Sequence, residues 1–140
     1  MARALGLLAR REHSRLELSK KLGARGFPRD VVARVIDRLE QSGALSESRF
    51  EESYIRARAA RGFGPMRIAA ELRERGIDVE RAVLANFDWS ALCEEARNKR
   101  FGGCPPARGP QWQKQARFLH GRGFPESLIR RVLSGRAASE

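Results

Sequence analysis

Arginine is the residue type with the clearest capacity for chemistry in this chain of 140 residues. Lysine and arginine together number 28, against 17 aspartate and glutamate residues, which gives a net charge of +11 at pH 7. A guanidinium group binds carboxylates and phosphates through paired hydrogen bonds, so this excess predicts an acidic protein or a nucleic acid as partner. We expect nine arginines outside the predicted core to bind it: Arg25, Arg29, Arg56, Arg58, Arg61, Arg67, Arg122, Arg130 and Arg131.

The positive charge is concentrated toward the two ends of the chain. Residues 1–60 carry 13 basic and 8 acidic residues, and residues 101–140 carry 7 and 2, whereas residues 61–100 are nearly balanced, with 8 and 7. The alternative to a polyanionic partner is an arginine-rich solvated surface that binds nothing in particular. Charge alone therefore favours a nucleic-acid or acidic-protein partner without deciding between these interpretations.

The main candidate surface is the arginine cluster around a turn rich in glycine. Arg56 and Arg58 follow Tyr54, and Arg61 and Arg67 flank the turn. The alternative interpretation is that one of the first two arginines pairs with a glutamate of the same chain. The other candidates form two further basic groups, one near residues 25–29 and one near residues 122–131.

Residues for catalysis or metal binding are not arranged in any pattern that predicts an enzyme. His13 and His120 lie far apart, and neither has a nearby nucleophile with an orienting carboxylate. The glycine-rich motifs of phosphate-binding loops are absent. Cys93 and Cys104 lack the paired short spacing of a zinc site. We therefore predict a protein that is not an enzyme and uses no cofactor or metal.

The apolar segments are too short for a membrane span of ~20 residues. The apolar stretch at the N-terminus is also too short for a secretory signal, and it ends in charged residues. We therefore expect a cytoplasmic, monomeric protein without a membrane partner, whose cysteines are reduced.

A repeated turn organises the chain. Ala-Arg-Gly-Phe-Pro at residues 24–28 returns as Gly-Arg-Gly-Phe-Pro at residues 121–125, and Glu-Arg-Gly-Ile-Asp at residues 74–78 is a looser copy. The central glycines are 50 and 47 residues apart, and this period is typical of tandem helical units. Apolar residues follow the first and last copies at identical offsets: Val31, Val32, Val35 and Ile36 match Leu128, Ile129, Val132 and Leu133.

The apolar spacing of three to four residues predicts helices almost throughout. Gly and Pro divide them into nine, at about residues 4–11, 15–23, 28–42, 47–61, 65–75, 78–87, 90–100, 110–120 and 125–134. Ser14, Ser46, Asp78 and Ser90 are the expected caps, with a capping box from Ser14 to Glu17. Pro28, Pro65, Pro110 and Pro125 suit first helical turns.

These helices group into three units of three. The predicted units are residues 1–45, 46–88 and 89–135, followed by a fraying tail at 136–140. Residues 102–109 form the one long loop. The aromatic residues on apolar stripes or repeat turns are predicted to pack in the core: Phe27, Phe50, Phe87, Phe118 and Phe124.

The motifs resemble the RecX family of RecA regulators over nearly the whole chain, from residue 4 to residue 133. The most specific segment is Leu-Ala-Arg-Arg-Glu-His-Ser-Arg-Leu-Glu-Leu at residues 8–18, followed by Gly-Ala-Leu-Ser-Glu-Ser-Arg-Phe at residues 43–50. Gly-Pro-Met-Arg-Ile at residues 64–68 resembles the middle unit of the family. Arg-Phe-Leu at residues 117–119 and Arg-Gly-Phe at residues 122–124 resemble its third unit.

The resemblance implies an all-α fold of three tandem three-helix repeats that form an elongated, curved array. It also implies a protein that binds RecA in its filament form and inhibits the ATPase, strand-exchange and coprotease activities of RecA. Direct binding to single-stranded or double-stranded DNA is expected to be weaker. Basic ends are compatible with a filament that contains DNA.

Two other classes of function stay open from the residues alone. The first is a basic helical module that binds DNA or RNA without RecA, although no helix carries the cluster of base-reading side chains expected for sequence recognition. The second is a helical scaffold for an unrelated acidic protein. Salt-dependent DNA binding without RecA favours the first, whereas weak DNA binding together with no effect on RecA favours the second.

Overall fold

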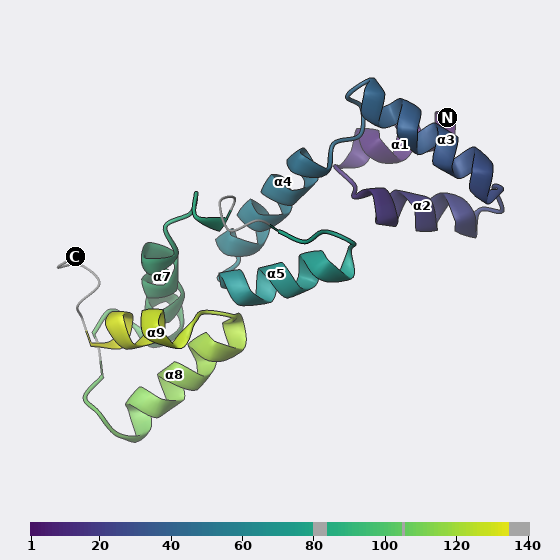
Figure 1. The fold of residues 1–140 in the computed structure, drawn as a ribbon. Coiled ribbons are helices and arrows are strands. Elements are labelled where there is room, and N and C mark those ends of the chain that lie inside the picture. Colours follow the sequence, from purple (N-terminus) through teal and green to yellow (C-terminus); the bar gives the residue numbers. More distant parts are fainter. Residues whose placement is uncertain (80–83, 105, 135–140) are drawn as a thin grey trace. The chain divides into compact units, whose positions relative to one another are not determined.

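The computed structural model describes residues 1–79, 84–104 and 106–134. Within these ranges all regular structure is helical, which confirms the all-α prediction (Figure 1). The helices are α1 (Ala2–Arg10), α2 (Arg15–Ala24), α3 (Arg29–Gln41), α4 (Glu47–Ala60), α5 (Pro65–Glu74), α7 (Trp89–Phe101), α8 (Pro110–Arg122) and α9 (Glu126–Leu133). The helix predicted at residues 78–87 falls across the gap at 80–83, and the predicted tail at 136–140 lies outside the described residues.

Local sequence signals set the starts of α2 and α4. At α2 the predicted capping box is present. The backbone N–H of Glu17 donates to the Ser14 hydroxyl at 3.1 Å, and the backbone N–H of Ser14 donates to the Glu17 carboxylate at 3.2 Å. At α4 the N–H of Arg49 donates to the Ser46 hydroxyl at 3.2 Å, which confirms the cap predicted there. Both serines satisfy N–H groups that have no partner within the first turn of a helix.

Three predicted helix starts need correction. Ser90 does not cap α7; the cap is Asp88, whose carboxylate accepts from the N–H of Ala91 at 3.1 Å. A carboxylate is favoured at this position because the N-terminus of a helix carries partial positive charge. Pro28 and Pro125 stand at the N-cap positions of α3 and α9, one residue before the first turn, since their backbones are extended.

The contacts divide the chain into two compact units, and each is described by itself. Unit 1 comprises Met1–Tyr54 and Leu72–Val79, and unit 2 comprises residues 55–71 together with the described residues from 84 onward. Helices α4 and α5 each contribute residues to both units. The predicted candidate arginines are therefore distributed over both units.

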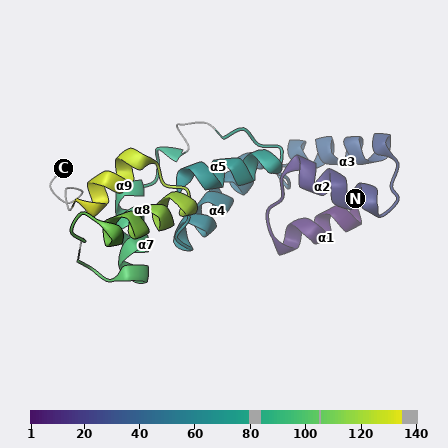
Figure 2. The ribbon, with the colours of Figure 1, turned by 90° about the horizontal axis from the view of Figure 1, so that it is seen from below.

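Unit 1 is built around α1, α2 and α3. Figure 1 and Figure 2 both show α2 and α3 side by side. The apolar stripes that the sequence predicts for these helices face one another, so burial of those stripes drives their packing. Its core is Ala4, Leu18, Leu22, Val32, Ile36, Leu39 and Leu45, with Leu7, Leu8, Val35 and Ala44 partly buried against it.

Unit 2 has its core among α7, α8 and α9. Each of these three helices contacts the other two, and both views show them gathered together (Figures 1 and 2). The core is Cys93, Ala96, Leu119, Phe124, Leu128, Ile129, Val132 and Leu133, with Trp89, Leu92, Trp112, Ala116 and Phe118 partly buried against it. The four apolar positions after the last repeat turn are all buried, as the repeat predicts.

The predicted aromatic core is confirmed in part. Phe50 and Phe124 are buried, whereas Phe87 and Phe118 are half-buried. Phe27 is a wrong prediction, because 43% of this residue is exposed. Its turn lies open: a Cβ atom built on the neighbouring Gly26 would meet no atom within 4 Å. Phe27 instead lines a surface hollow together with Val32 and Ile36 of α3.

Candidate functional site

Three predicted candidate arginines converge on one aromatic ring in unit 2. The guanidinium carbons of Arg58, Arg67 and Arg122 lie 3.8, 4.4 and 4.7 Å from the centre of the Phe63 ring. A cation over an aromatic face is attracted by the negative charge of that face. Phe63 thereby gathers arginines that come from α4, α5 and α8.

Glu71 neutralises part of this arginine cluster. Its carboxylate accepts two hydrogen bonds from Arg58, both at 2.8 Å, and it lies 3.3 Å from Nε of Arg67. The side chains of Arg58 and Glu71 are about 20% exposed, at 21% and 19%. Such a bidentate pair is strong and geometrically specific. Arg58 thus follows the alternative interpretation of internal pairing.

Two glycine turns contact each other beside the cluster. The N–H of Gly64 donates to the carbonyl of Arg122 at 2.7 Å, and the N–H of Met66 donates to the carbonyl of Gly123 at 2.9 Å. A Cβ atom on Gly64 would lie 2.5 Å from the carbonyl carbon of Gly123, and a Cβ on Gly123 would lie 2.4 Å from Cβ of Arg67. Only glycine allows this approach, which fixes the position of Arg122 relative to the end of α4.

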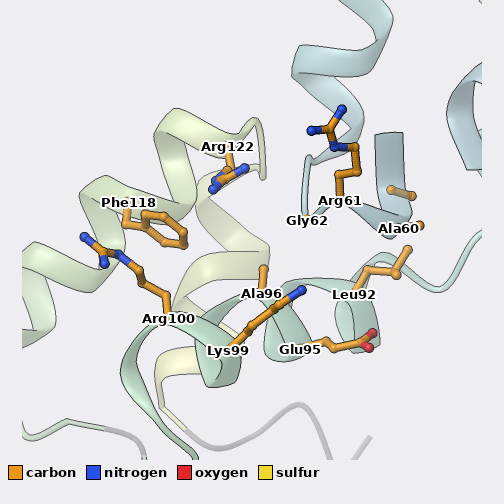
Figure 3. Close-up of a pocket in the computed structure, with 11 residues that line it drawn as sticks. Ala60, Arg61, Gly62, Leu92, Glu95, Ala96, Lys99, Arg100, Phe118 and Arg122 are labelled. Carbon is orange, nitrogen blue, oxygen red and sulfur yellow. The ribbon is translucent and has the colours of Figure 1, made fainter. Parts of the chain in front are cut away.

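A basic hollow of about 280 Å³ lies at the C-terminal ends of α4, α7 and α8 (Figure 3). Its cations are Arg61, which follows α4, Lys99 and Arg100 of α7, and Arg122 of α8. The remaining lining residues are Ala59, Ala60, Gly62, Leu92, Glu95, Ala96 and Phe118. We call these eleven residues the basic hollow.

The four cations of the basic hollow have no carboxylate within ion-pair distance among the described residues. Elsewhere most arginines with candidate roles are paired or engaged: Arg130, for example, lies 2.7 Å from Glu126. Glu95 is the single acidic residue of the lining, and it makes no such pair. Four positive side chains without carboxylate partners create a positive potential that attracts an anion.

The nine predicted partner-binding arginines fall into separate places. Arg61 and Arg122 line the basic hollow, and Arg58 and Arg67 join Arg122 around Phe63. The others lie outside this site, exposed on the surface: Arg25, Arg29, Arg56, Arg130 and Arg131. Arg25 and Arg29 belong to unit 1, where Arg29 lines a second hollow over α2 and α3.

Sequence reasoning missed Lys99 and Arg100. Both lie in the last turn of α7, where cations interact favourably with the partial negative charge of the helix end. The available signal was their position three and four residues after Ala96, which places all three on one stretch of helix surface. That spacing predicts a shared surface, but it does not predict that α4 and α8 end beside it.

The described residues offer no metal cluster, and the thiol of Cys93 is buried. No three His, Cys, Asp or Glu side chains among them are placed to hold a metal ion. Burial raises the pKa of the Cys93 thiol to about 12, so this group stays protonated and unreactive. None of the described helices is long and apolar enough to cross a membrane.

Comparison with known proteins extends over nearly the whole chain. Three family models match in order: the first three-helix domain of RecX at residues 1–39, the second at residues 46–82 and the third at residues 88–133. These matches confirm the prediction of three three-helix repeats.

Similar sequences and structures carry the same description. The regulatory protein RecX of Pseudomonas savastanoi pv. phaseolicola is 43% identical over 98% of this chain and 91% of its own length. That of Pseudomonas entomophila is 44% identical over 95% of this chain and 88% of its own length. The crystal structure of RecX from Lactobacillus salivarius aligns with a TM-score of 0.77 at 19% identity, over 98% of this chain and 94% of that one. The domains and the identity together show that the chain belongs to the RecX family of regulatory proteins.

Proposed function

We propose that this protein regulates RecA by binding its nucleoprotein filament and inhibiting its ATPase, strand-exchange and coprotease activities. It would thereby modulate homologous recombination, DNA repair and the SOS response. The observation that carries the proposal is membership of the RecX family, with 43% identity over 98% of the chain. The protein acts without catalysis of its own, as a monomer in the cytoplasm. It binds DNA directly, but more weakly than it binds the RecA filament.

The partner-binding residues that we propose are the cations of the basic hollow together with exposed arginines elsewhere on the chain. The basic hollow supports this assignment, because it is lined by four positive side chains that have no carboxylate partner among the described residues. Two further exposed basic groups belong to the proposal: Arg25 and Arg29 in unit 1, and Arg130 and Arg131 on α9 in unit 2, where Arg130 also pairs with Glu126. Arg58 has the different role of holding Glu71 and Phe63 in place.

Three linked three-helix repeats suit a partner made of repeated protomers. We propose that the repeats at residues 1–45, 46–88 and 89–135 engage successive RecA protomers. Once one repeat is bound, the others act at a high effective concentration, so the affinity of the whole chain far exceeds that of each repeat. Reversing the charge of a single basic group should then weaken inhibition strongly, rather than by its share of the contacts.

The decisive experiment is the steady-state ATPase rate of the cognate RecA on single-stranded DNA during titration with this protein. Inhibition well below one molecule per RecA protomer is expected if the protein stops filament growth or promotes disassembly. Inhibition that requires nearly equal amounts indicates occupancy of the filament groove instead. An unchanged rate would contradict the proposed function.

A helical DNA-binding module that acts without RecA is the second candidate. The net charge of +11 and the uncompensated cations of the basic hollow favour it, because phosphates attract such groups. Its signature is tight binding to DNA alone, with an affinity that falls steeply as salt concentration increases. DNA binding measured without RecA at several salt concentrations distinguishes the two candidates.

A further inference from the structure

We infer that the basic hollow is a receptor for one carboxylate side chain on a protein segment, with an apolar side chain of the same segment beside it. This inference rests on the proposed function, because it names the kind of segment that the regulated protein would present to this site. It adds a ligand chemistry and four named cations: Arg61, Lys99, Arg100 and Arg122.

The amount of charge in the hollow suits one carboxylate better than a run of phosphates. The ends of α4, α7 and α8 meet there, and each helix C-terminus contributes a partial charge of about −0.5. Together with the carboxylate of Glu95, these ends offset part of the four positive charges and leave roughly one to two. All four cations line the same hollow, with Arg122 and Arg100 on either side of Phe118 (Figure 3).

The aromatic residue of the hollow is unsuited to stacking on a nucleobase. The guanidinium carbons of Arg122 and Arg100 lie over the Phe118 ring, at 5.1 and 5.8 Å from its centre. Phe101 packs against the same ring in a T-shaped arrangement at 5.3 Å. A base that stacked there would have to displace these groups. Single-strand binding sites depend on such open aromatic surfaces, so the arrangement favours a protein ligand.

The same stacking leaves each of the two arginines able to bind a carboxylate. A guanidinium that lies over a ring keeps the N–H groups along its edge available, and these groups form paired bonds to a carboxylate. Leu92 and Ala96 supply an apolar lining beside the cations. An apolar side chain next to the bound carboxylate would be removed from water there, which adds affinity.

A charge-reversal pair tests the inference directly. Lys99→Glu with Arg100→Glu changes two exposed cations of the hollow. Lys114→Glu with Arg117→Glu, on exposed positions of α8 outside the hollow, applies the same charge change as the matched control. Because all four residues are exposed, circular dichroism should show both variants folded.

Each protein is titrated by NMR with an acetylated Ser-Glu-Leu-Glu-Ser peptide, with the Ser-Gln-Leu-Gln-Ser peptide and with a short oligothymidylate. We expect the glutamate peptide to shift signals from the lining of the hollow and the glutamine peptide to leave them unchanged. The hollow variant should weaken glutamate-peptide binding by about tenfold or more, against less than about twofold for the control variant.

Three results would overturn the inference. The first is equal binding of the two peptides, and the second is equal loss of peptide binding in both variants. The third is a hollow that shifts with the oligothymidylate and not with the glutamate peptide, which would make it a nucleic-acid site.

A parallel RecA ATPase titration separates this inference from the proposed function. If the original protein inhibits RecA and the hollow variant inhibits it equally well, the inference fails and the proposed function stands. If the original protein does not inhibit RecA at all while the glutamate peptide still binds the hollow, the proposed function fails and the carboxylate receptor stands.

Discussion

The turns at residues 24–28 and 121–125 share the Arg-Gly-Phe-Pro sequence, yet their phenylalanines have opposite environments. Phe27 in unit 1 is 43% exposed, whereas Phe124 in unit 2 is 0% exposed and belongs to the core. Gly26 has open space where a Cβ would be, but Gly123 packs directly on Arg67. The two glycines have the same left-handed backbone, with φ of 88° and 101°.

The difference shows that the repeat specifies the conformation of the turn but not its burial. The later turn is covered because Gly64 and Met66 donate their N–H groups to its carbonyls. Among the described residues, the earlier turn has no corresponding contact. One turn sequence therefore serves as part of a packed site in unit 2 and as an open surface in unit 1.

Truncation of the two phenylalanines should give the largest contrast. Phe124→Ala removes a fully buried ring and should lower the free energy of unfolding by about 3–5 kcal/mol. Phe27→Ala should cost about 1 kcal/mol, because its ring already contacts water. Urea denaturation of both variants measures the difference. Equal losses would mean that Phe27 is buried in solution.

Alanine at the two glycines should give a somewhat smaller contrast. Gly26→Ala incurs only the cost of a left-handed backbone, about 1–2 kcal/mol. Gly123→Ala adds a clash with Arg67, so its total should be about 2–5 kcal/mol. Thermal unfolding compares the two variants. A Gly123→Ala variant no less stable than Gly26→Ala would rule out the close contact between the turns.

Removal of one charge from a partly buried ion pair and from a more exposed one sharpens the comparison further. Glu71→Gln removes the negative charge that accepts the two hydrogen bonds of the partly buried Arg58 and should cost about 1–3 kcal/mol. Glu40→Gln breaks the more exposed pair with Arg15 in unit 1 and should cost less than about 1 kcal/mol. Denaturant titrations at low and high salt provide the measurement, and the Glu40 effect should fade with salt. A larger loss for Glu40 would contradict the assigned burial.

The smallest predicted effect is a pH dependence in unit 1. His13 is buried, its Nδ1 lies 3.1 Å from the carbonyl oxygen of Arg11, and its Nε2 lies 2.8 Å from Nζ of Lys21. Burial lowers the pKa of His13 from its ordinary value of 6.5, and the nearby cations Arg11 and Lys21 lower it further, whereas the Arg11 carbonyl and the Glu17 carboxylate act in the opposite direction. The unfolded chain then binds more protons than the folded chain below pH 6.5.

The contribution of His13 to the free energy of unfolding should therefore be fully present above pH 6.5. It should decrease as the pH falls toward the lowered pKa of His13. Unfolding measured between pH 7.5 and 5 should show less of this slope in a His13→Gln variant. His120→Gln, at an exposed position of α8, is the matched control and should retain it. An unchanged slope in the His13 variant would show that other groups are responsible.

The features that could be predicted depend on residues that are close to one another in the sequence. The Ser14 capping box and the Ser46 cap need only a serine and the next turn of helix, so both were predicted correctly. The Ser90 prediction was wrong because Asp88 offers a better acceptor within the same few residues. The basic hollow was predicted only in part, since Arg61 and Arg122 were candidates but Lys99 and Arg100 were not.

The sequence by itself determined the eight described helices, the apolar stripes of α3 and α9, the repeated turn and the family. These features depend on backbone preferences and side-chain spacing within one or two helical turns. Only the tertiary structure decided that Phe124 is buried while Phe27 is exposed, and that the ends of α4, α7 and α8 surround one basic hollow. Such contacts join residues about 60 positions apart, such as Gly64 and Gly123. Backbone preferences and side-chain spacing within a few residues do not predict contacts at that separation.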